Sequence, residues 1–338
     1  MRCASSLAAG LGLTLVLAGC TGGSTPTPTS QAGRGAGTSA HGSPSSSTPP
    51  TGSPARTPSA SPAHTPAPSG PATSTSPPTP ASYRLDVVRR GTDHPDDLAL
   101  DAAGALLYSD YTSGTITRLN PDGSATVLHR GLPGPEGMVL LPDGTLVVAE
   151  QDANRLVEFK PGRSTPIVLA ALPGTSVKAT CHQGVDGIAW DPATTSLVVP
   201  DPVTGTVYRI SADGTSRSVL ARGFVRPVGA AVGPDGRVYV ADECGGGVWR
   251  LGPGGSRVRV AEAVMPDDLA FDAAGNLLVT DVRHTRHDVR GWPRGGGAPT
   301  VLARSGLFEP QGLLVSPSGT IFVADDQARL VLRLTPRR

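Results

Sequence analysis

Carboxylic acids recur at one place in an internal repeat of the chain. The repeat opens six times with a short phrase whose second residue is, in chain order, Asp96, Glu136, Asp186, Val228, Asp267 and Gln311. If the repeats surround an axis, four carboxylates crowd together, and crowded carboxylates must be protonated or neutralised by a cation. A hard divalent ion, Ca²⁺ or Mg²⁺, takes such oxygen ligands. The alternative is that each acid accepts a hydrogen bond from a neighbouring repeat and only holds the repeats together.

Further reactive groups stand where the repeat is broken. Asp97 and Asp268 replace a glycine of the other four phrases, and two irregular loops carry lysine and histidine. Imidazoles and carboxylates around one opening could do acid/base or metal chemistry. The catalytic candidates are His182, His284 and Asp268; the ligand-binding candidates are Asp97, Lys178, Gln311 and His287; the metal candidates are Asp96, Glu136, Asp186 and Asp267. The alternative is that the loop histidines are ordinary solvated side chains.

The segments that must position these groups read as short antiparallel strands. Each repeat passes from an apolar strand through a turn, such as Pro142-Asp-Gly144, into a β-rich strand ending in an acid, such as "VYVAD" to Asp242, and then into a third and a fourth strand. The pattern recurs about every 40 to 50 residues. Turns at this spacing between short β-rich runs are typical of four-stranded antiparallel units.

Six such units predict an all-β fold, a six-bladed β-propeller over residues 83–338. The sixth repeat lacks a fourth strand after 331–334. Asp86-Val-Val-Arg-Arg-Gly91 matches the fourth-strand phrase Thr126-Val-Leu-His-Arg-Gly131. We therefore expect the N-terminal strand to complete the last blade and close the ring, which removes open sheet edges.

First strands begin, and the loops after second strands open, on the same face of a propeller, here called the top face. The departures from the repeat fall mostly on this face, around the mouth of the central channel. The acids that end the second strands occur in all six blades, so we interpret them as structural caps of the following turn: Asp110, Glu150, Asp201, Asp242, Asp281 and Asp325.

Cys181 and Cys244 fall in top-face loops of adjacent blades. Two thiols in an oxidising compartment favour one disulfide, which would brace the mouth of the channel. Two unrelated free or buried cysteines are the alternative.

The N-terminus predicts export. Arg2 precedes an apolar run, Leu7 to Leu17, that is too short to span a bilayer and ends in Leu17-Ala18-Gly19-Cys20. This resembles the bacterial lipobox, which implies a signal peptide over 1–19 and acylation of Cys20. An ordinary signal peptide with a chance cysteine is the alternative. We expect a domain anchored in the cell membrane on its extracytoplasmic side.

Composition separates a linker from the folded domain. The chain has 43 Gly and 34 Pro, and the stretch 21–82 contains no Leu, Ile, Val, Met, Phe, Trp or Tyr. Such a stretch cannot offset its ordering entropy, so 20–82 is expected to be a disordered, lipid-anchored linker. With 29 basic and 28 acidic residues, the chain has no bulk charge for binding nucleic acid.

The phrases "PEGMVLLPDGTLVVAEQDANRLVEF" and "PVGAAVGPDGRVYVADECGGGVWRL" resemble NHL-type repeats. The whole of 83–338 is similar to the six-bladed propellers of NHL proteins, streptogramin lyases and the gluconolactonase/regucalcin family, and "FVRPVGAAVGPDGRVYVAD" is also similar to quinone-dependent sugar dehydrogenases. Gluconolactonases hold a divalent ion with a Glu, an Asp and an Asn. Asp267 resembles the Asp, Glu136 or Asp96 could stand for the Glu, and Val228 stands where the Asn is written.

Since Val228 cannot coordinate an ion, the resemblance transfers a fold more firmly than a reaction. We therefore expect a monomeric ligand- or protein-binding module at the bacterial cell envelope, whose partner is an envelope protein or a small molecule. The alternative is a divalent-metal-dependent hydrolase or lyase of the gluconolactonase or streptogramin-lyase type.

Overall fold

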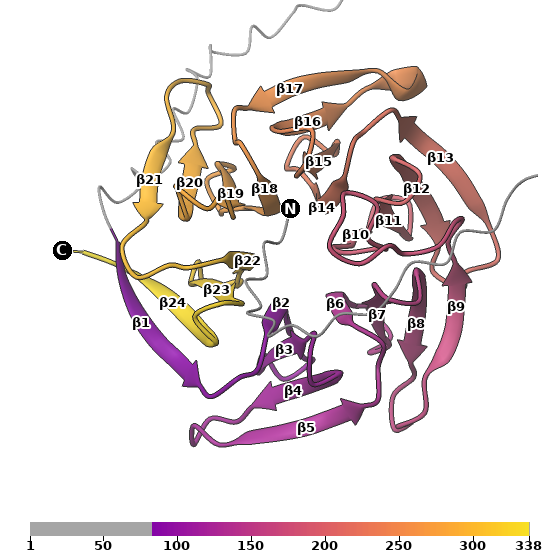
Figure 1. The fold of residues 1–338 in the computed structure, drawn as a ribbon, viewed down its shortest axis with the longest axis horizontal. Coiled ribbons are helices and arrows are strands. Elements are labelled where there is room, and N and C mark those ends of the chain that lie inside the picture. Colours follow the sequence, from indigo (N-terminus) through magenta and orange to yellow (C-terminus); the bar gives the residue numbers. More distant parts are fainter. Residues whose placement is uncertain (1–82, 338) are drawn as a thin grey trace, which may run out of the picture. The chain divides into compact units, whose positions relative to one another are not determined.

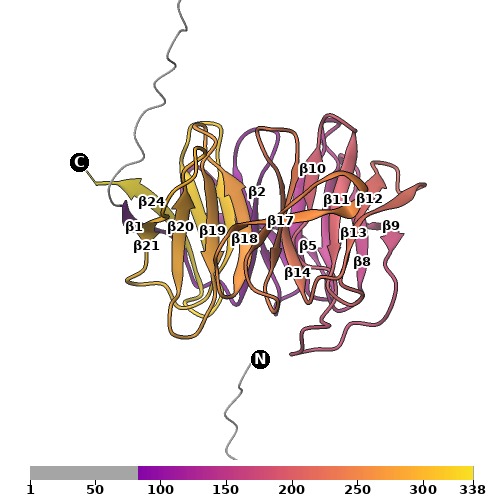
Figure 2. The same ribbon diagram turned by 90° about the horizontal axis from the view of Figure 1, so that it is seen from above.

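The computed structural model describes residues 83–337, which form six four-stranded antiparallel sheets around a central axis (Figure 1). Viewed edge-on, the sheets stand side by side like blades (Figure 2). Within these residues no helix has the length and apolar character needed to cross a membrane. Cys20 and the segments 1–19 and 20–82 lie outside the described residues, so the signal peptide, lipid anchor and linker stay predictions.

The strands of the first three blades follow one another in the chain. Blade 1 holds β2 (Pro95–Leu100), β3 (Leu106–Asp110), β4 (Thr115–Leu119) and β5 (Ala125–Arg130); blade 2 holds β6 (Pro135–Leu140), β7 (Leu146–Glu150), β8 (Arg155–Phe159) and β9 (Ile167–Ala171); blade 3 holds β10 (Ala189–Asp191), β11 (Ser196–Asp201), β12 (Thr206–Ser211) and β13 (Arg217–Arg222).

Blades 4 and 5 keep this order, blade 4 adds one short 3-10 helix, and blade 6 takes its fourth strand from the N-terminal end of the folded domain. Blade 4 holds β14 (Pro227–Val232), β15 (Val238–Asp242), β16 (Val248–Leu251), the helix η1 (Pro253–Gly255) and β17 (Arg257–Ala261); blade 5 holds β18 (Pro266–Phe271), β19 (Leu277–Asp281), β20 (Asp288–Trp292) and β21 (Thr300–Ala303); blade 6 holds β22 (Pro310–Val315), β23 (Ile321–Asp325), β24 (Leu330–Pro336) and β1 (Tyr83–Arg90).

The predicted closure of the ring is confirmed. β1 pairs antiparallel with β24, from Tyr83 opposite Pro336 to Arg90 opposite Leu330. Side chains of blades 1 and 6 also share one buried cluster, which includes Tyr108 and Val331. The two ends of the folded domain are thus joined by backbone hydrogen bonds and by apolar packing, as the six-bladed propeller requires.

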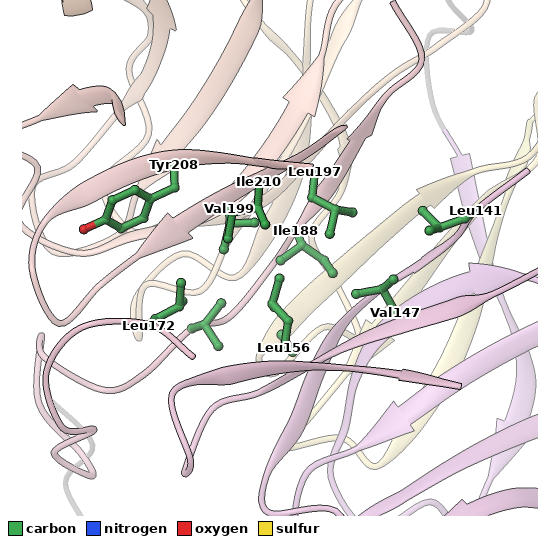
Figure 3. Close-up of a cluster of buried hydrophobic side chains, with 11 residues drawn as sticks. Leu141, Val147, Leu156, Leu172, Ile188, Leu197, Val199, Tyr208 and Ile210 are labelled. Carbon is green, nitrogen blue, oxygen red and sulfur yellow. The ribbon is translucent and has the colours of Figure 1, made fainter. Parts of the chain in front are cut away.

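The apolar core lies between the blades. On β7, Val147 and Ala149 pack toward blade 3, whereas Leu146 and Val148 pack toward blade 1. A strand buried on both faces needs no polar alternation, which explains the continuous run "LVVA". Figure 3 shows the cluster between blades 2 and 3.

The opening of blade 3 differs from the expected pattern. Its phrase at 185–188 is not a strand, and β10 begins only at Ala189. The backbone there is engaged across the blades instead, because the carbonyl of Asp186 accepts the Gly137 N–H at 3.2 Å. Asp186 still reaches the axis, at the end of the long loop that follows β9.

Candidate functional site

The acids that end the second strands position the mouth of the channel. Asp242 accepts the backbone N–H groups of Val225 and Arg226 at 2.8–3.2 Å, and Asp110 accepts those of Asp93 and His94 at 2.8 and 3.1 Å. With Asp281 and Asp325, they fix the connection that leads into the first strand of blades 1, 4, 5 and 6. Asp201 accepts hydrogen bonds from the turn that follows it, and Glu150 pairs with Arg155. Their interpretation as structural groups is confirmed.

Three carboxylates meet at the axis. Asp96, Glu136 and Asp186 each bring one oxygen to within 4.8 Å of the others, and all three side chains are buried. Glu136 is fully buried, and neither of its carboxylate oxygens has a hydrogen-bond donor among the described residues. Because burying an ionised carboxylate without a partner is costly, this cluster needs either a proton or a cation.

The protonation of these acids follows from their burial. Desolvation raises the pKa of Glu136 well above its usual range, and the negative charges of Asp186 and Asp96 raise it further. Desolvation, followed by the charges of Asp186, Glu243 and Asp96, also raises the pKa of Asp267. Asp267 is not one of the three grouped carboxylates, but the charges of Asp186 and Asp96 act on it.

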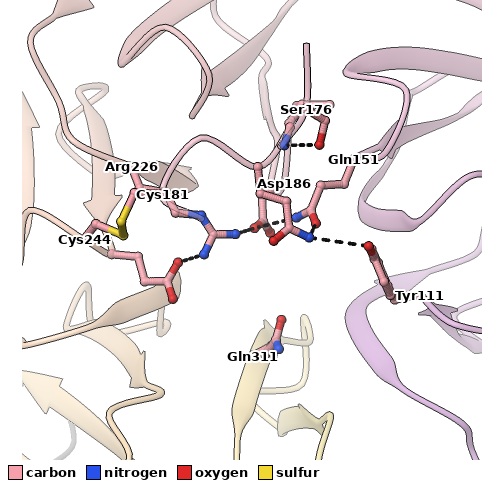
Figure 4. Close-up of polar contacts among 12 residues, drawn as sticks. Tyr111, Gln151, Ser176, Cys181, Asp186, Arg226, Cys244 and Gln311 are labelled. Carbon is pink, nitrogen blue, oxygen red and sulfur yellow. Dashed lines mark hydrogen bonds and ion pairs between the residues drawn. A yellow bond between two sulfur atoms is a disulfide. The ribbon is translucent and has the colours of Figure 1, made fainter. Parts of the chain in front are cut away.

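One buried cation already faces the cluster. Arg226 donates from Nη2 to Oδ2 of Asp186 at 3.1 Å and from Nη1 to Glu243 (Figure 4). Gln151 donates to the same Oδ2 at 3.2 Å. Asp186 thus has two donors on one oxygen, whereas Glu136 beside it has none.

A loop from blade 2 covers one side of the mouth. Gln183, at the end of this loop, is buried and donates to Gln151 and, at 3.4 Å, to the hydroxyl of Tyr111. The disulfide between Cys181 and Cys244 ties the loop to blade 4, with the Cα atoms 6.1 Å apart, so the predicted bridge is confirmed. Figure 4 shows the bridge beside the Arg226 ion pairs.

A histidine and an aspartate pair on the opposite side of the mouth. His94 Nδ1 contacts Asp326 Oδ1, and Asp326 Oδ2 accepts a hydrogen bond from Gln311 at 3.0 Å. Asp326 is buried, while about a quarter of the His94 side chain is exposed. A histidine oriented by a carboxylate through one ring nitrogen presents the other nitrogen as a proton acceptor.

Asp97 and Asp268 connect neighbouring blades. Asp97 accepts the Met138 N–H at 2.6 Å, and Asp268 accepts the Leu313 N–H at 2.8 Å. Both acids line a small pocket in the channel, with room for about one water molecule or ion; its other lining residues are Asp96, Asp186, Gly187, Gly229, Asp267 and Gly312. Burial raises the pKa of Asp97 to about 7, and that of Asp268 is also raised.

The glycines of the other four blades show why this position is special. A Cβ at Gly137, Gly229 or Gly312 would lie 2.3–2.5 Å from a carbonyl oxygen of the next blade. Such a distance is a clash with backbone, so glycine is required there. Asp97 and Asp268 mark the two junctions that are bridged by a side chain instead.

The other residues predicted from sequence have contacts of their own in the top-face loops. Lys178 pairs with Asp152 at 2.7 Å, and His182 is exposed on the loop from blade 2. His284 and His287 stack on each other with ring centroids 6.2 Å apart, in the loop of blade 5. None of them joins the three-carboxylate group found within residues 83–337.

Sequence reasoning overlooked Arg226, Gln151, Gln183 and Asp326 and left His94 unassigned. A signal was present for Arg226, since the residue before the first strand is His94, Gly134, Met265 or Glu309 in other blades. Blade 4 departs from the repeat at two positions. An arginine stands before its first strand, and the apolar Val228 stands where four other blades carry an acid.

Comparison with known proteins agrees with this architecture. The NHL repeat model matches residues 224–251. No curated protein matches the chain.

Three solved structures illustrate the likeness. A gluconolactonase from Xanthomonas campestris is 16% identical, with a TM-score of 0.64 over 75% of this chain and 90% of its own. Virginiamycin B lyase from Staphylococcus aureus is 14% identical (TM-score 0.57; 75% and 99% covered), and a PQQ-bound aldose sugar dehydrogenase from Streptomyces coelicolor is 17% identical (TM-score 0.58; 76% and 99% covered).

Fold and mouth together define the class of this protein, a six-bladed β-propeller with a buried acidic cluster on its axis. More particularly, it is a propeller that carries an NHL repeat and has the architecture of the gluconolactonase, streptogramin-lyase and sugar-dehydrogenase structures. At these identities the likeness concerns the fold, and function must be argued from the mouth itself.

Proposed function

We propose that the propeller binds a divalent cation, Ca²⁺ or Mg²⁺, at Asp96, Glu136 and Asp186 and uses it to hold a ligand on the top face. The observation that carries the proposal is Glu136, fully buried with both oxygens lacking a donor. Carboxylate oxygens within 4.8 Å of one another fit the ligand spacing around such an ion. Only oxygen ligands are offered, which favours a hard cation.

In this proposal the domain is an extracytoplasmic binding module, a monomer tethered to the cell membrane through acylated Cys20. The cation has three protein ligands, so positions remain for oxygens of a ligand. Asp186 would ligate through Oδ1, because Arg226 and Gln151 already donate to its Oδ2. The rigid top face, braced by the disulfide, supports the role of a preformed binding surface.

The full-length protein, treated with a chelator, should gain stability when Ca²⁺ or Mg²⁺ is restored. At a free ion concentration of 100 times Kd the gain is about 2.7 kcal/mol, or roughly 5–10 °C in Tm for a domain of this size. Glu136→Gln should lose this response without losing apo stability, since it removes a buried charge. Thermal unfolding with each ion and with the matched control Glu262→Gln, an exposed acid, measures the effect. A full response in Glu136→Gln would contradict the proposal.

A second candidate function, hydrolysis of an ester or lactone, is favoured by His94 and Asp326. A divalent ion at the mouth would polarise a carbonyl oxygen. His94, oriented by Asp326 through Nδ1, would accept a proton from water at Nε2. Gln311 holds Asp326 from its other oxygen.

If the protein hydrolyses γ-butyrolactone or phenyl acetate, His94→Ala should lower kcat/KM by about 10²–10⁴-fold. The control Arg294→Ala changes an exposed turn on the opposite face and should leave the rate unchanged. A rate that survives in His94→Ala but disappears with the chelator would remove His94 from the chemistry.

A further inference from the structure

The top face and the opposite, bottom face of the propeller differ in charge. Loops and strand ends of the bottom face expose acids and bases in nearly equal number: Asp122, Asp143, Asp213 and Asp235 beside Arg163, Arg217, Arg237, Arg294 and Arg337. On the top face of the described chain Glu262 is the one exposed acid, and the exposed bases are Arg90, Arg130, Lys178, Arg222, Arg283, Arg286, Arg304 and Arg329. The acids on the axis are neutralised by a proton or a cation and oppose this charge little. The top face is therefore the basic face.

Five of these bases gather over blades 5 and 6, and we call them the basic rim: Arg90, Arg283, Arg286, Arg304 and Arg329. Arg90 pairs with Leu330 across β1 and β24, so it lies beside Arg329. The strands β21, β24 and β1 lie next to one another at one side of the ring (Figure 1). Glu309, in the connection between the two blades, is partly buried. The positive charge of the rim is therefore not balanced by exposed acids of these two blades.

Buried carboxylates hold the blade 5 part of the basic rim in place. Asp281 accepts the backbone N–H of Arg283 at 3.1 Å. Asp288, which follows the same loop and is fully buried, accepts Nη2 of Arg304 at 3.0 Å and Nη2 of Arg290 at 2.9 Å on one oxygen. About half of the Arg304 side chain is still exposed. The loop and Arg304 are thus presented together, on one fixed part of the top face.

An exposed aromatic side chain stands among these bases. Phe308 is 60% exposed, more than any other large hydrophobic residue of the described chain. Its backbone N–H donates to Asp325 at 2.9 Å, and the charge of His287 acts on the same carboxylate. Phe308 therefore lies close to the loop 283–287 and four residues after Arg304. Arginine and phenylalanine together are typical of segments that lie in the headgroup region of a membrane.

The spread of the basic rim decides which partner fits. Its bases come from two loops, a connection and a strand end of two blades, which is too broad for one small anion. An extended anionic surface contacts all of them, and each Arg beside anionic lipid strengthens binding by about fivefold. A soluble polyanion would use the bases but would leave Phe308 in water. The predicted anchor at Cys20 would keep the domain near a lipid surface.

We propose that the basic rim, together with Phe308, docks the propeller on an anionic lipid surface. The top face and the mouth of the channel are then turned toward the membrane, and the bottom face is turned away from it. This inference goes beyond the proposed cation site and does not need it, because the bases lie in the loops outside the mouth.

Vesicle binding by residues 83–338 tests this inference. These residues can be used alone, because β1 closes the ring and the buried clusters lie within them; without Cys20 no lipid anchor contributes. At low salt and with a chelator present, the domain should bind vesicles of equal parts phosphatidylglycerol and phosphatidylcholine at least about tenfold more tightly than vesicles of phosphatidylcholine. Added salt should weaken this binding. Cosedimentation measures each affinity.

Variants assign the binding to the basic rim. Arg283→Gln combined with Arg286→Gln should lower the affinity for the anionic vesicles about 25-fold, fivefold for each base. The matched control, Arg163→Gln combined with Arg294→Gln, removes two exposed bases from bottom-face turns and should leave the affinity unchanged. Phe308→Ser should weaken binding to the vesicles and leave binding to soluble polyphosphate unchanged.

Each contrary result overturns the inference in a different way. Equal binding to both kinds of vesicle, or full affinity in the Arg283 and Arg286 double variant, would show that the basic rim does not bind lipid. Binding that requires Ca²⁺ or Mg²⁺ would place the contact at the mouth instead. Polyphosphate bound as tightly as the vesicles, with no effect of Phe308→Ser on either, would make the partner a soluble polyanion. The stability response of Glu136→Gln to the cation is measured separately, so failure of the proposed function remains distinguishable.

Discussion

Replacing Cys181 and Cys244 together by serine is expected to lower the free energy of unfolding by about 4 kcal/mol. The bridge closes a loop of 63 residues, and the entropy that such a crosslink removes from the unfolded chain has this magnitude. The loop that it holds also carries Gln183 into the mouth. The loss should therefore be accompanied by a weaker response to the divalent cation.

Urea unfolding of the full-length protein measures this loss. Reductant should shift the unfolding midpoint of the wild type to that of the double variant and should leave the variant unchanged. The variant is thus its own control for effects of the reductant elsewhere in the chain. A wild-type midpoint that does not move under reductant would show that the bridge contributes little to stability.

The fold could be predicted from the sequence because its determinants are local. The turns, the β-rich runs and the acid ending each second strand recur within each repeat, so six copies give six independent indications of the same unit. Even the closure by β1 was visible, since Asp86–Gly91 copies the fourth-strand phrase of blade 1. Blade 3 departs from the pattern, because its first strand begins only at Ala189 and the residues before it contact blade 2.

The mouth was predicted only in part, because its contacts join residues that are far apart in the chain. The recurring acids at Asp96, Glu136 and Asp186 do meet, as the repeat implies. The pair His94 and Asp326 spans 232 residues and belongs to different blades. Such a contact leaves no pattern in the sequence, since it depends on the ring closing and on which side chains turn toward the axis.

Replacing Arg226 by methionine is expected to cost about 3–5 kcal/mol at neutral pH, the usual effect of removing one partner from a buried ion pair. Arg226 is buried and pairs with both Asp186 and Glu243. Without it, both carboxylates lose their buried cation next to Glu136. The matched control is Arg237→Met, which removes a half-exposed arginine 3.8 Å from Asp235 and should cost less than about 1 kcal/mol.

The pH dependence of this loss identifies its cause. An acid whose native pKa is raised keeps its proton at pH values where the unfolded chain has lost it, so stability falls as pH rises from about 4 through the native pKa. Burial raises the pKa of Glu136, Asp267 and, to about 7, Asp97. Arg226 opposes this rise at Glu136 and Asp267. Its removal should therefore steepen the fall in stability between pH 5 and 8, and the Arg226→Met variant should lose less at pH 5 than at pH 8.

The divalent cation provides the final discrimination. If Arg226 stabilises the mouth by neutralising its acids, a cation at Asp96, Glu136 and Asp186 should restore part of the loss, and Arg226→Met should bind that cation more tightly than the wild type because one competing positive charge is gone. Unfolding measured at pH 5 and pH 8, with chelator and with the cation, gives all four values. A loss that is equal at both pH values and insensitive to the cation would mean that Arg226 acts through packing alone. In that case the acids on the axis would be kept neutral by shared protons and not by Arg226.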